Sequence, residues 1–189
     1  MNFTDYQPRA IAFASFQPTT QLDTLHGVLG MVSEAGEISE CLRDHSVYGK
    51  LLDRKNLVGE LGDFMWFATL TITVLGASLN TLVTTLPRHL PADEDPTPLL
   101  LEISCSIADK FKAPLVYGKP LDSISILESI ANAIYLINEI AERHDYEMVE
   151  ILDANIAKLT ARYGDKFSAE KALNRNTDAE FKAIEAATT

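Results

Sequence analysis

The chain has 189 residues, 47% hydrophobic and 23% charged, and can bury the core of one domain or of two small ones. Its formal net charge of −11 argues against nucleic acid or an anionic membrane surface as a partner, because both require clustered lysine and arginine. The two cysteines, Cys41 and Cys105, make no disulfide framework, which fits a reducing cytoplasm.

The first six residues lack the basic start and the apolar run of a signal peptide. The longest apolar stretch, residues 64–79, contains three threonines and falls short of the roughly 20 apolar residues that a membrane span needs. We therefore expect a soluble cytoplasmic protein with no membrane partner.

Two carboxylate pairs mark the first half, residues 1–83. Glu34 and Glu37 lie on one predicted helix, and Glu60 and Asp63 lie on the next. Residues three apart share a helix face, so two packed helices would gather four carboxylates. A single pair of this kind is more often a solvated helix face. The second pair, however, leads into the apolar residues 64–70, and acids beside a buried helix cost free energy unless they are compensated.

Charge repulsion indicates how the acids are compensated. Two carboxylates ~5 Å apart repel by roughly 3 kcal/mol at an effective dielectric of about 20, so the cluster must bind protons, bind cations or separate. Hard divalent cations take oxygen ligands. We predict a metal-binding half with a Mg²⁺ site, which Mn²⁺ could also occupy, at Glu34, Glu37, Glu60 and Asp63.

An internal repeat organises the chain. Residues 47–53 recur as residues 116–122 with six identities in seven positions, an offset of 69 residues. The same offset matches apolar positions on both sides, such as Leu61 with Ile130. Each copy is predicted to form a helix, a Tyr-Gly-Lys turn and a long apolar helix. We expect an all-α helical bundle whose two helix pairs are related by a pseudo-twofold axis, with a homodimer of whole chains left open.

The second copy, residues 99–176, lacks the acids. It has Ile103, Ser106, Ser129 and Asn132 at the matching positions, so it cannot hold a divalent cation there. It continues instead into a helix on which Asn155, Lys158 and Arg162 share one face.

Proline and glycine predict the remaining boundaries. Residues 84–98 hold four of the eight prolines and predict a linker between the copies. Gly164 predicts a helix C-cap, and Ser168 predicts the N-cap of a short helix through Leu173. Residues 177–189, rich in alanine and charge, predict a tail that forms a loosely held helix.

Four segments carry a family resemblance. They are residues 26–37, residues 47–57, residues 60–66, and the pattern Asn155-x-x-Lys158-x-x-x-Arg162-Tyr163 with Phe167 following. Together they resemble the MazG-like all-α nucleoside triphosphate pyrophosphohydrolases of phages and bacteria. The resemblance covers roughly residues 20–70 and 145–176. Gly59 departs from it, because many relatives have a further acid there. The degenerate second copy also departs from it and resembles the fused units of the dimeric dUTPases.

The resemblance implies a Mg²⁺-dependent hydrolase that converts a nucleoside triphosphate and water to a nucleoside monophosphate and pyrophosphate. The four acids would hold the metal, and Glu37, or else Glu34, would take the proton of the attacking water. Lys158, Arg162 and Lys50 would stabilise the leaving pyrophosphate. A basic helix end in solvent is the alternative reading of Lys158 and Arg162.

Base recognition needs a flat apolar wall and a few polar groups. Trp66, Phe16, His26 and Asn56 are the candidates, although Trp66 also fits a core position and His26 a surface one. A di-iron carboxylate bundle is disfavoured because the chain has no Glu-x-x-His motif. A non-catalytic nucleotide-binding sensor, or a helical interaction module, is the alternative function. The retention of all four acids argues against it.

Overall fold

The computed structural model describes residues 1–85 and 94–188, and within these ranges the chain forms nine α-helices and no β-strand. The predicted all-α fold is confirmed. The helices are α1 (Phe3–Ile11), α2 (Thr20–Ser46), α3 (Arg54–Val74), α4 (Leu79–Thr85), α5 (Pro96–Tyr117), α6 (Ser123–Arg143), α7 (Met148–Tyr163), α8 (Ala169–Leu173) and α9 (Thr177–Ala187).

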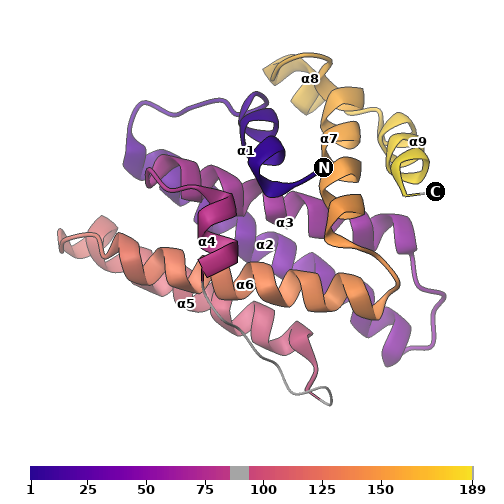
Figure 1. Cartoon of the computed structure of the whole chain (residues 1–189), viewed down its shortest axis with the longest axis horizontal. Helices are drawn as coiled ribbons and strands as arrows, with labels where there is room; N and C mark the ends of the chain where they lie inside the picture. Colours follow the sequence, from indigo (N-terminus) through magenta and orange to yellow (C-terminus); the bar gives the residue numbers. More distant parts are fainter. Residues whose placement is uncertain (86–93, 189) are drawn as a thin grey trace.

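Four long helices form the body of the molecule. Helix α2 packs against α3, α5 packs against α6, and α2 also packs against α5. Figure 1 shows these four running along the long axis, while α1, α4, α7, α8 and α9 lie over one side of them. Fully buried side chains of both copies, such as Ile38, Leu61, Ile107 and Ile130, join in one hydrophobic core.

The two copies of the repeat begin their second helices in the same way. Asp53 caps α3 by accepting a hydrogen bond from the backbone N–H of Asn56, and Asp122 caps α6 by accepting one from Ser125. Such caps satisfy amide groups that have no partner inside the helix.

The turn before each cap and the end of each second helix also match. Gly49 and Gly118 have φ of 66° and 64°, and Gly76 and Asp145, after α3 and α6, have φ of 75° and 65°. All four lie in the left-handed region that favours glycine. The repeat found in the sequence is therefore also a repeat of backbone conformation.

Contacts with the shorter helices follow the repeat only in part. Helix α7 packs against α3, and α4, which follows α3 as α7 follows α6, packs against α6. The pseudo-twofold axis itself stays a prediction. Helix α4 ends at Thr85 and α5 begins at Pro96, with Asp95 as its N-cap, so helices enter both ends of the predicted linker. Residues 86–93 of that linker lie outside the described residues.

The C-terminal region begins as predicted but ends differently. Gly164 follows the last residue of α7, and Ser168 caps α8, which ends at Leu173. The expectation of a loosely held tail is wrong, because α9 packs against α7 and α3 and buries Glu180 and Ile184. An isolated helix of 11 residues is marginal in water, so this packing stabilises α9.

Helices α3 and α6 are long and apolar enough to cross a membrane by length and composition alone, which the sequence analysis did not expect. The structure buries 67% of the most apolar 18-residue segment of α3 and 50% of that of α6. A core helix of a soluble protein can be equally long and apolar. Their apolar character is accounted for by the core that they form.

Candidate metal and nucleotide site

Close packing of α2 on α3 places the acidic residues. A Cβ atom added to Gly27 would lie 2.1 Å from Oγ1 of Thr71, and one added to Gly30 would lie 2.2 Å from Cδ1 of Phe67. These distances are far below van der Waals contact, so only glycine permits this approach of the two helices. Residues Glu34 and Glu37 follow on the same helix, where they meet the first turns of α3.

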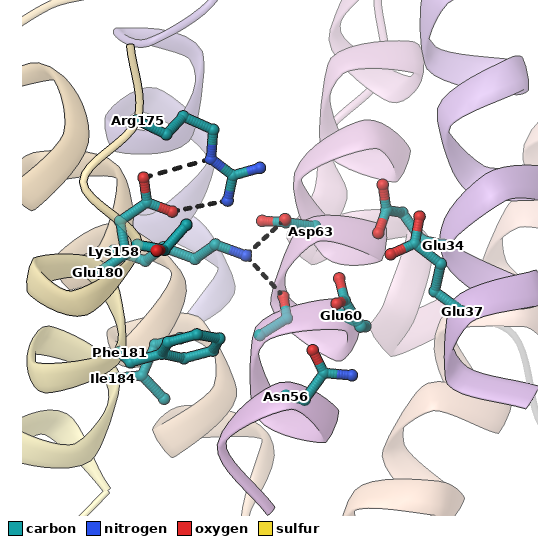
Figure 2. Close-up of a pocket in the computed structure, with 12 residues that line it drawn as sticks. Glu34, Glu37, Asn56, Glu60, Asp63, Lys158, Arg175, Glu180, Phe181 and Ile184 are labelled. Atoms are coloured by element: carbon teal, nitrogen blue, oxygen red, sulfur yellow. Dashed lines mark hydrogen bonds and ion pairs between the residues drawn. The ribbon is translucent and has the colours of Figure 1, made fainter. Parts of the chain in front are cut away.

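Glu34, Glu37 and Glu60 form a three-carboxylate cluster between the two helices. One carboxylate oxygen of each lies within 4.8 Å of the others. Glu34 is only 9% exposed, whereas Glu37 is exposed to solvent. Figure 2 shows Glu34 and Glu37 on α2 facing Glu60 and Asp63 on α3. Acids of the two predicted pairs therefore lie close together across neighbouring helices, with Glu34, Glu37 and Glu60 in one cluster.

Burial and like charge act together on this cluster. Desolvation, together with the charges of Asp63, Glu60 and Glu37, raises the pKa of Glu34 from its ordinary 4.5 to about 9. Desolvation also raises the pKa of Glu60, against the opposing effect of Lys158. The cluster therefore favours a bound proton or a bound cation over three free negative charges.

Asp63, the fourth predicted ligand, is engaged differently. Its Oδ2 accepts a hydrogen bond from Nζ of Lys158 at 2.6 Å, and its Oδ1 accepts one from Nδ2 of Asn155 at 3.1 Å. Oδ1 of Asn155 in turn accepts a hydrogen bond from the buried hydroxyl of Tyr6 at 2.8 Å. The predicted residues of α7 thus reach the acidic site from the second copy, but they meet Asp63 first.

Close packing also brings α7 to the site. A Cβ atom on Gly62 would lie 2.9 Å from Cβ of Asn155, and one on Gly59 would lie 3.5 Å from Nζ of Lys158. The backbone carbonyl of Gly59 accepts a hydrogen bond from the same Nζ at 3.5 Å. The ammonium group of Lys158 therefore lies against the backbone of Gly59, where a larger residue would crowd it.

A cavity of about 200 Å³ opens over the carboxylates. Figure 2 shows the acids on one side of it and α7 and α9 on the other. Its lining combines the acids with cations and an apolar edge from α9: Glu34, Glu37, Asn56, Gly59, Glu60, Asp63, Lys158, Arg175, Thr177, Glu180, Phe181 and Ile184.

Arg162, predicted to contact phosphate, is bound within the protein. Glu180 accepts hydrogen bonds from its Nε at 2.9 Å and from its Nη2 at 2.6 Å. Glu180 also accepts a second pair, from Nε and Nη2 of Arg175, at 3.3 and 2.7 Å. Burial would raise the pKa of Glu180, but the hydrogen bonds from the two arginines lower it to about 2. Burial would likewise lower the pKa of Arg162, and its hydrogen bonds with Glu180 raise it instead.

A second cavity, of about 410 Å³, adjoins the first and is largely aromatic. Trp66 and Phe67 pack edge to face with centroids 5.0 Å apart, and His26 packs against both. The Trp66 indole donates a hydrogen bond to the carbonyl of Ala10 at 2.9 Å, which fixes its orientation. The cavity is lined by Phe13, Ser15, Gln17, His26, Glu34, Asp63, Trp66, Phe67, Leu159, Arg162, Tyr163, Phe167 and Arg175.

The other residues predicted to bind the base or the phosphates lie in different places. Phe16 is 55% exposed and does not line the aromatic cavity, and Asn56 lines the acidic one. His26 does line the aromatic cavity, and burial lowers the pKa of its imidazole, which favours the neutral ring. Lys50 lines neither cavity; its Nζ pairs with Asp44 at 2.7 Å beside a third cavity that Glu37 and Glu60 also border.

Sequence reasoning missed several of the lining residues, among them Phe13, Phe67, Arg175 and Glu180. Phe67 could have been found, because it lies four residues after Asp63 on the same helix face. Phe13 lies in the turn after α1, Arg175 lies in the loop before α9, and Glu180 lies on α9. No spacing rule connects those segments to the acids.

The donor set fits Mg²⁺. Three carboxylates supply the hard oxygen ligands that this ion prefers, and one oxygen of each lies within 4.8 Å of the others. Burial and the neighbouring carboxylates raise the pKa of Glu34, so negative charge in the cluster is favoured only with a proton or a cation bound. Comparisons of the chain with protein-family models, with curated proteins and with solved structures found no match.

Proposed function

We propose that the chain is a Mg²⁺-dependent nucleoside triphosphate pyrophosphohydrolase, which converts a (deoxy)nucleoside triphosphate and water to the monophosphate and pyrophosphate. One observation carries the proposal: the aromatic cavity and the acidic cavity adjoin and share Glu34, Asp63 and Arg175. A nucleotide has the same two parts, a flat base and a polyanionic chain.

Glu34, Glu37 and Glu60 would hold Mg²⁺, with Asp63 as the fourth predicted ligand. Bound Mg²⁺ would neutralise the triphosphate and lower the pKa of a water molecule beside the α-phosphorus. Without positive charge, a cavity lined by these acids would repel a substrate with about four negative charges. The dependence on a divalent cation therefore follows from the charge of both partners.

The reaction forms one bond and breaks one. The water oxygen bonds to the α-phosphorus, and the bond between that phosphorus and the oxygen bridging to the β-phosphate breaks, so pyrophosphate leaves with the electron pair. The water proton needs an acceptor within hydrogen-bond reach. Glu37 suits this role, because it is the solvent-exposed member of the cluster and Glu34 is enclosed.

Lys158 would assist departure of pyrophosphate. Its side chain is 7% exposed and is held by Asp63 at the edge of the acidic cavity. A fixed cation in a site of low dielectric stabilises developing negative charge at little reorganisation cost. Asn155 would act less directly, by orienting Asp63.

The aromatic cavity would hold the base. Stacking of a base on an aromatic side chain contributes about 1–3 kcal/mol and depends little on base identity. Trp66, Phe67 and Tyr163 offer such faces, and His26 and Gln17 offer polar groups that could distinguish bases.

The test is pyrophosphate release from a panel of ribo- and deoxynucleoside triphosphates, with Mg²⁺ and with chelator. Turnover that requires the metal and yields the monophosphate supports the proposal. Nucleotide binding without turnover of any member would replace it with the alternative of a nucleotide-binding sensor.

A further inference from the structure

Arg175 is a cation at the junction of the two cavities. It lies between α8 and α9. Among the lysines and arginines of the described chain that line these cavities, Lys158 borders the acidic one, Arg162 borders the aromatic one, and Arg175 borders both. Figure 2 shows its guanidinium between Glu180 and Asp63.

The junction is where a bound nucleotide would change from base to phosphate. The other residues that line both cavities are Glu34 and Asp63, and each brings a carboxylate. Any anionic chain that crosses from the aromatic rings to the acidic cluster therefore passes two acids and one guanidinium. Arg175 supplies the attraction there.

The three cations also differ in how firmly the protein holds them. The side chains of Lys158 and Arg162 are 7% and 11% exposed, and each is bound to a buried or half-buried acid. The side chain of Arg175 is 45% exposed. A guanidinium has five N–H donors in a planar fork, and Glu180 engages Arg175 through Nε and Nη2. The rest of the fork can meet an oxyanion.

Glu180 can hold Arg175 in place because Glu180 is itself fixed. Its side chain is 3% exposed, and the guanidinium of Arg162 also binds both of its oxygens. Arg175 is thus fixed at one edge and open at the other. Such preorganisation reduces the entropy lost when a ligand binds.

We propose that Arg175 binds the phosphate chain of the substrate at the junction of the two cavities, with Glu180 as the residue that positions its guanidinium. The identity of the ligand rests on the proposed function. The expectation that a cation at this junction binds a polyphosphate does not.

The experiment compares Arg175→Ala with Lys182→Ala. Lys182 lies exposed on α9 and lines neither cavity, so it controls for the loss of one positive charge near the site. The probe is inorganic tripolyphosphate with Mg²⁺, measured by titration calorimetry, and the nucleotide panel supplies kcat and KM. Arg175→Ala should weaken tripolyphosphate binding about tenfold or more, with a similar rise in KM and a smaller change in kcat. Lys182→Ala should leave all three unchanged.

Arg175→Lys keeps the charge without the planar fork and should fall between the wild type and Arg175→Ala. Circular dichroism and thermal unfolding check that each variant folds, and Arg175→Lys carries the test if Arg175→Ala does not. Tripolyphosphate affinity that is equal in the wild type and in the folded variants, or no binding by the wild type, overturns the inference. Wild-type protein that binds tripolyphosphate through Arg175 but hydrolyses no nucleotide overturns the hydrolase proposal alone.

Discussion

The α2–α3 pair and the α5–α6 pair share their turns and caps, but the charged groups between their helices have opposite signs. In the first pair, Glu34, Glu37 and Glu60 gather within 4.8 Å of one another. In the second, Ser129 stands at the position of Glu60, and Nζ of Lys110 donates hydrogen bonds to its hydroxyl at 2.7 Å and to the carbonyl of Ser125 at 3.1 Å. The second copy places a lysine between its helices, and at the position of Lys110 the first copy has Cys41.

The comparison separates scaffold from site. The backbone conformations that the copies share, at Asp53 and Asp122 or at Gly49 and Gly118, support the helices whatever lies between them. A small set of residues, among them the three glutamates and Gly30, makes one copy a candidate site. At the position of Gly30 the second copy has Leu99, which would leave no room for the ring of Phe67.

The largest effect should come from removing an acid of the first copy. Glu60→Gln keeps the shape of the side chain but removes a metal-ligating charge, and we expect pyrophosphate release to fall about a thousandfold or more with the helical circular dichroism retained. Ser129→Ala, at the matching position of the second copy, should leave turnover unchanged. Full activity of Glu60→Gln would end the assignment of the metal site to the first copy, and so would its rescue by Ser129→Glu.

The next effect concerns the attachment of α9, which joins the extension of the second copy to the site of the first. Glu180→Ala leaves two guanidinium groups without their anion, one of them on a side chain only 11% exposed, and should lower the free energy of unfolding by about 3 kcal/mol. Urea unfolding at neutral pH measures this change. A loss comparable to that of an exposed surface substitution would show that the Arg162–Glu180 pair does not hold α9.

The same carboxylate predicts a pH dependence. The pKa of Glu180 is lowered to about 2 from its ordinary 4.5, so the unfolded chain takes up the proton first as the pH falls. The stabilisation is complete above the unfolded pKa and is lost as the pH decreases from about 4.5 to about 2. Glu180→Ala should lack this part of the acid sensitivity. Identical unfolding profiles for wild type and variant over that range would contradict the lowered pKa.

A smaller effect should follow from Gly30→Ala. The added methyl group meets the ring of Phe67, and overpacking of this kind costs about 1–3 kcal/mol. The ring should move within the aromatic cavity and raise the KM for nucleotides. Gly36→Ala is the matched control on the same helix, because its Cβ would meet nothing within 4 Å and the higher helix propensity of alanine should add about 0.5–1 kcal/mol. Equal melting temperatures for the two variants would show that the packing of α2 on α3 accommodates a methyl group at residue 30 without cost.

The smallest effect should come from Lys110→Met in the second copy. The substitution removes the two hydrogen bonds to Ser125 and Ser129 but keeps an unbranched apolar stem. We expect a loss of about 1 kcal/mol in the free energy of unfolding and no change in turnover. A large decrease in turnover would show that the second copy contributes to the chemistry.

Helix periodicity explains what could be predicted from the sequence. The caps at Gly164 and Ser168 and the side-by-side placement of Glu34 with Glu37 depend on residues a few positions apart. The internal repeat is visible because a run of identical residues recurs along the chain. The burial that raises the pKa of Glu34 was also foreseeable, since Glu60 and Asp63 lead directly into an apolar helix.

Charge pairing and the C-terminal helix could not be predicted in this way. The chain has 27 acidic and 16 basic residues, and no local pattern assigns Lys158 to Asp63 or Arg162 to Glu180. The aromatic cavity likewise combines Phe13 with Tyr163, which are far apart in the sequence.

The sequence by itself determined the long helices of the two copies, the duplication and the two carboxylate pairs, because each depends on spacing within one turn or on repetition along the chain. Only the tertiary structure decided which cation meets which acid, that α9 closes the acidic cavity, and that Arg175 stands where the two cavities join. The physical reason is that the free energy of an ion pair depends on distance and burial, and both are set by packing between segments that the sequence keeps apart.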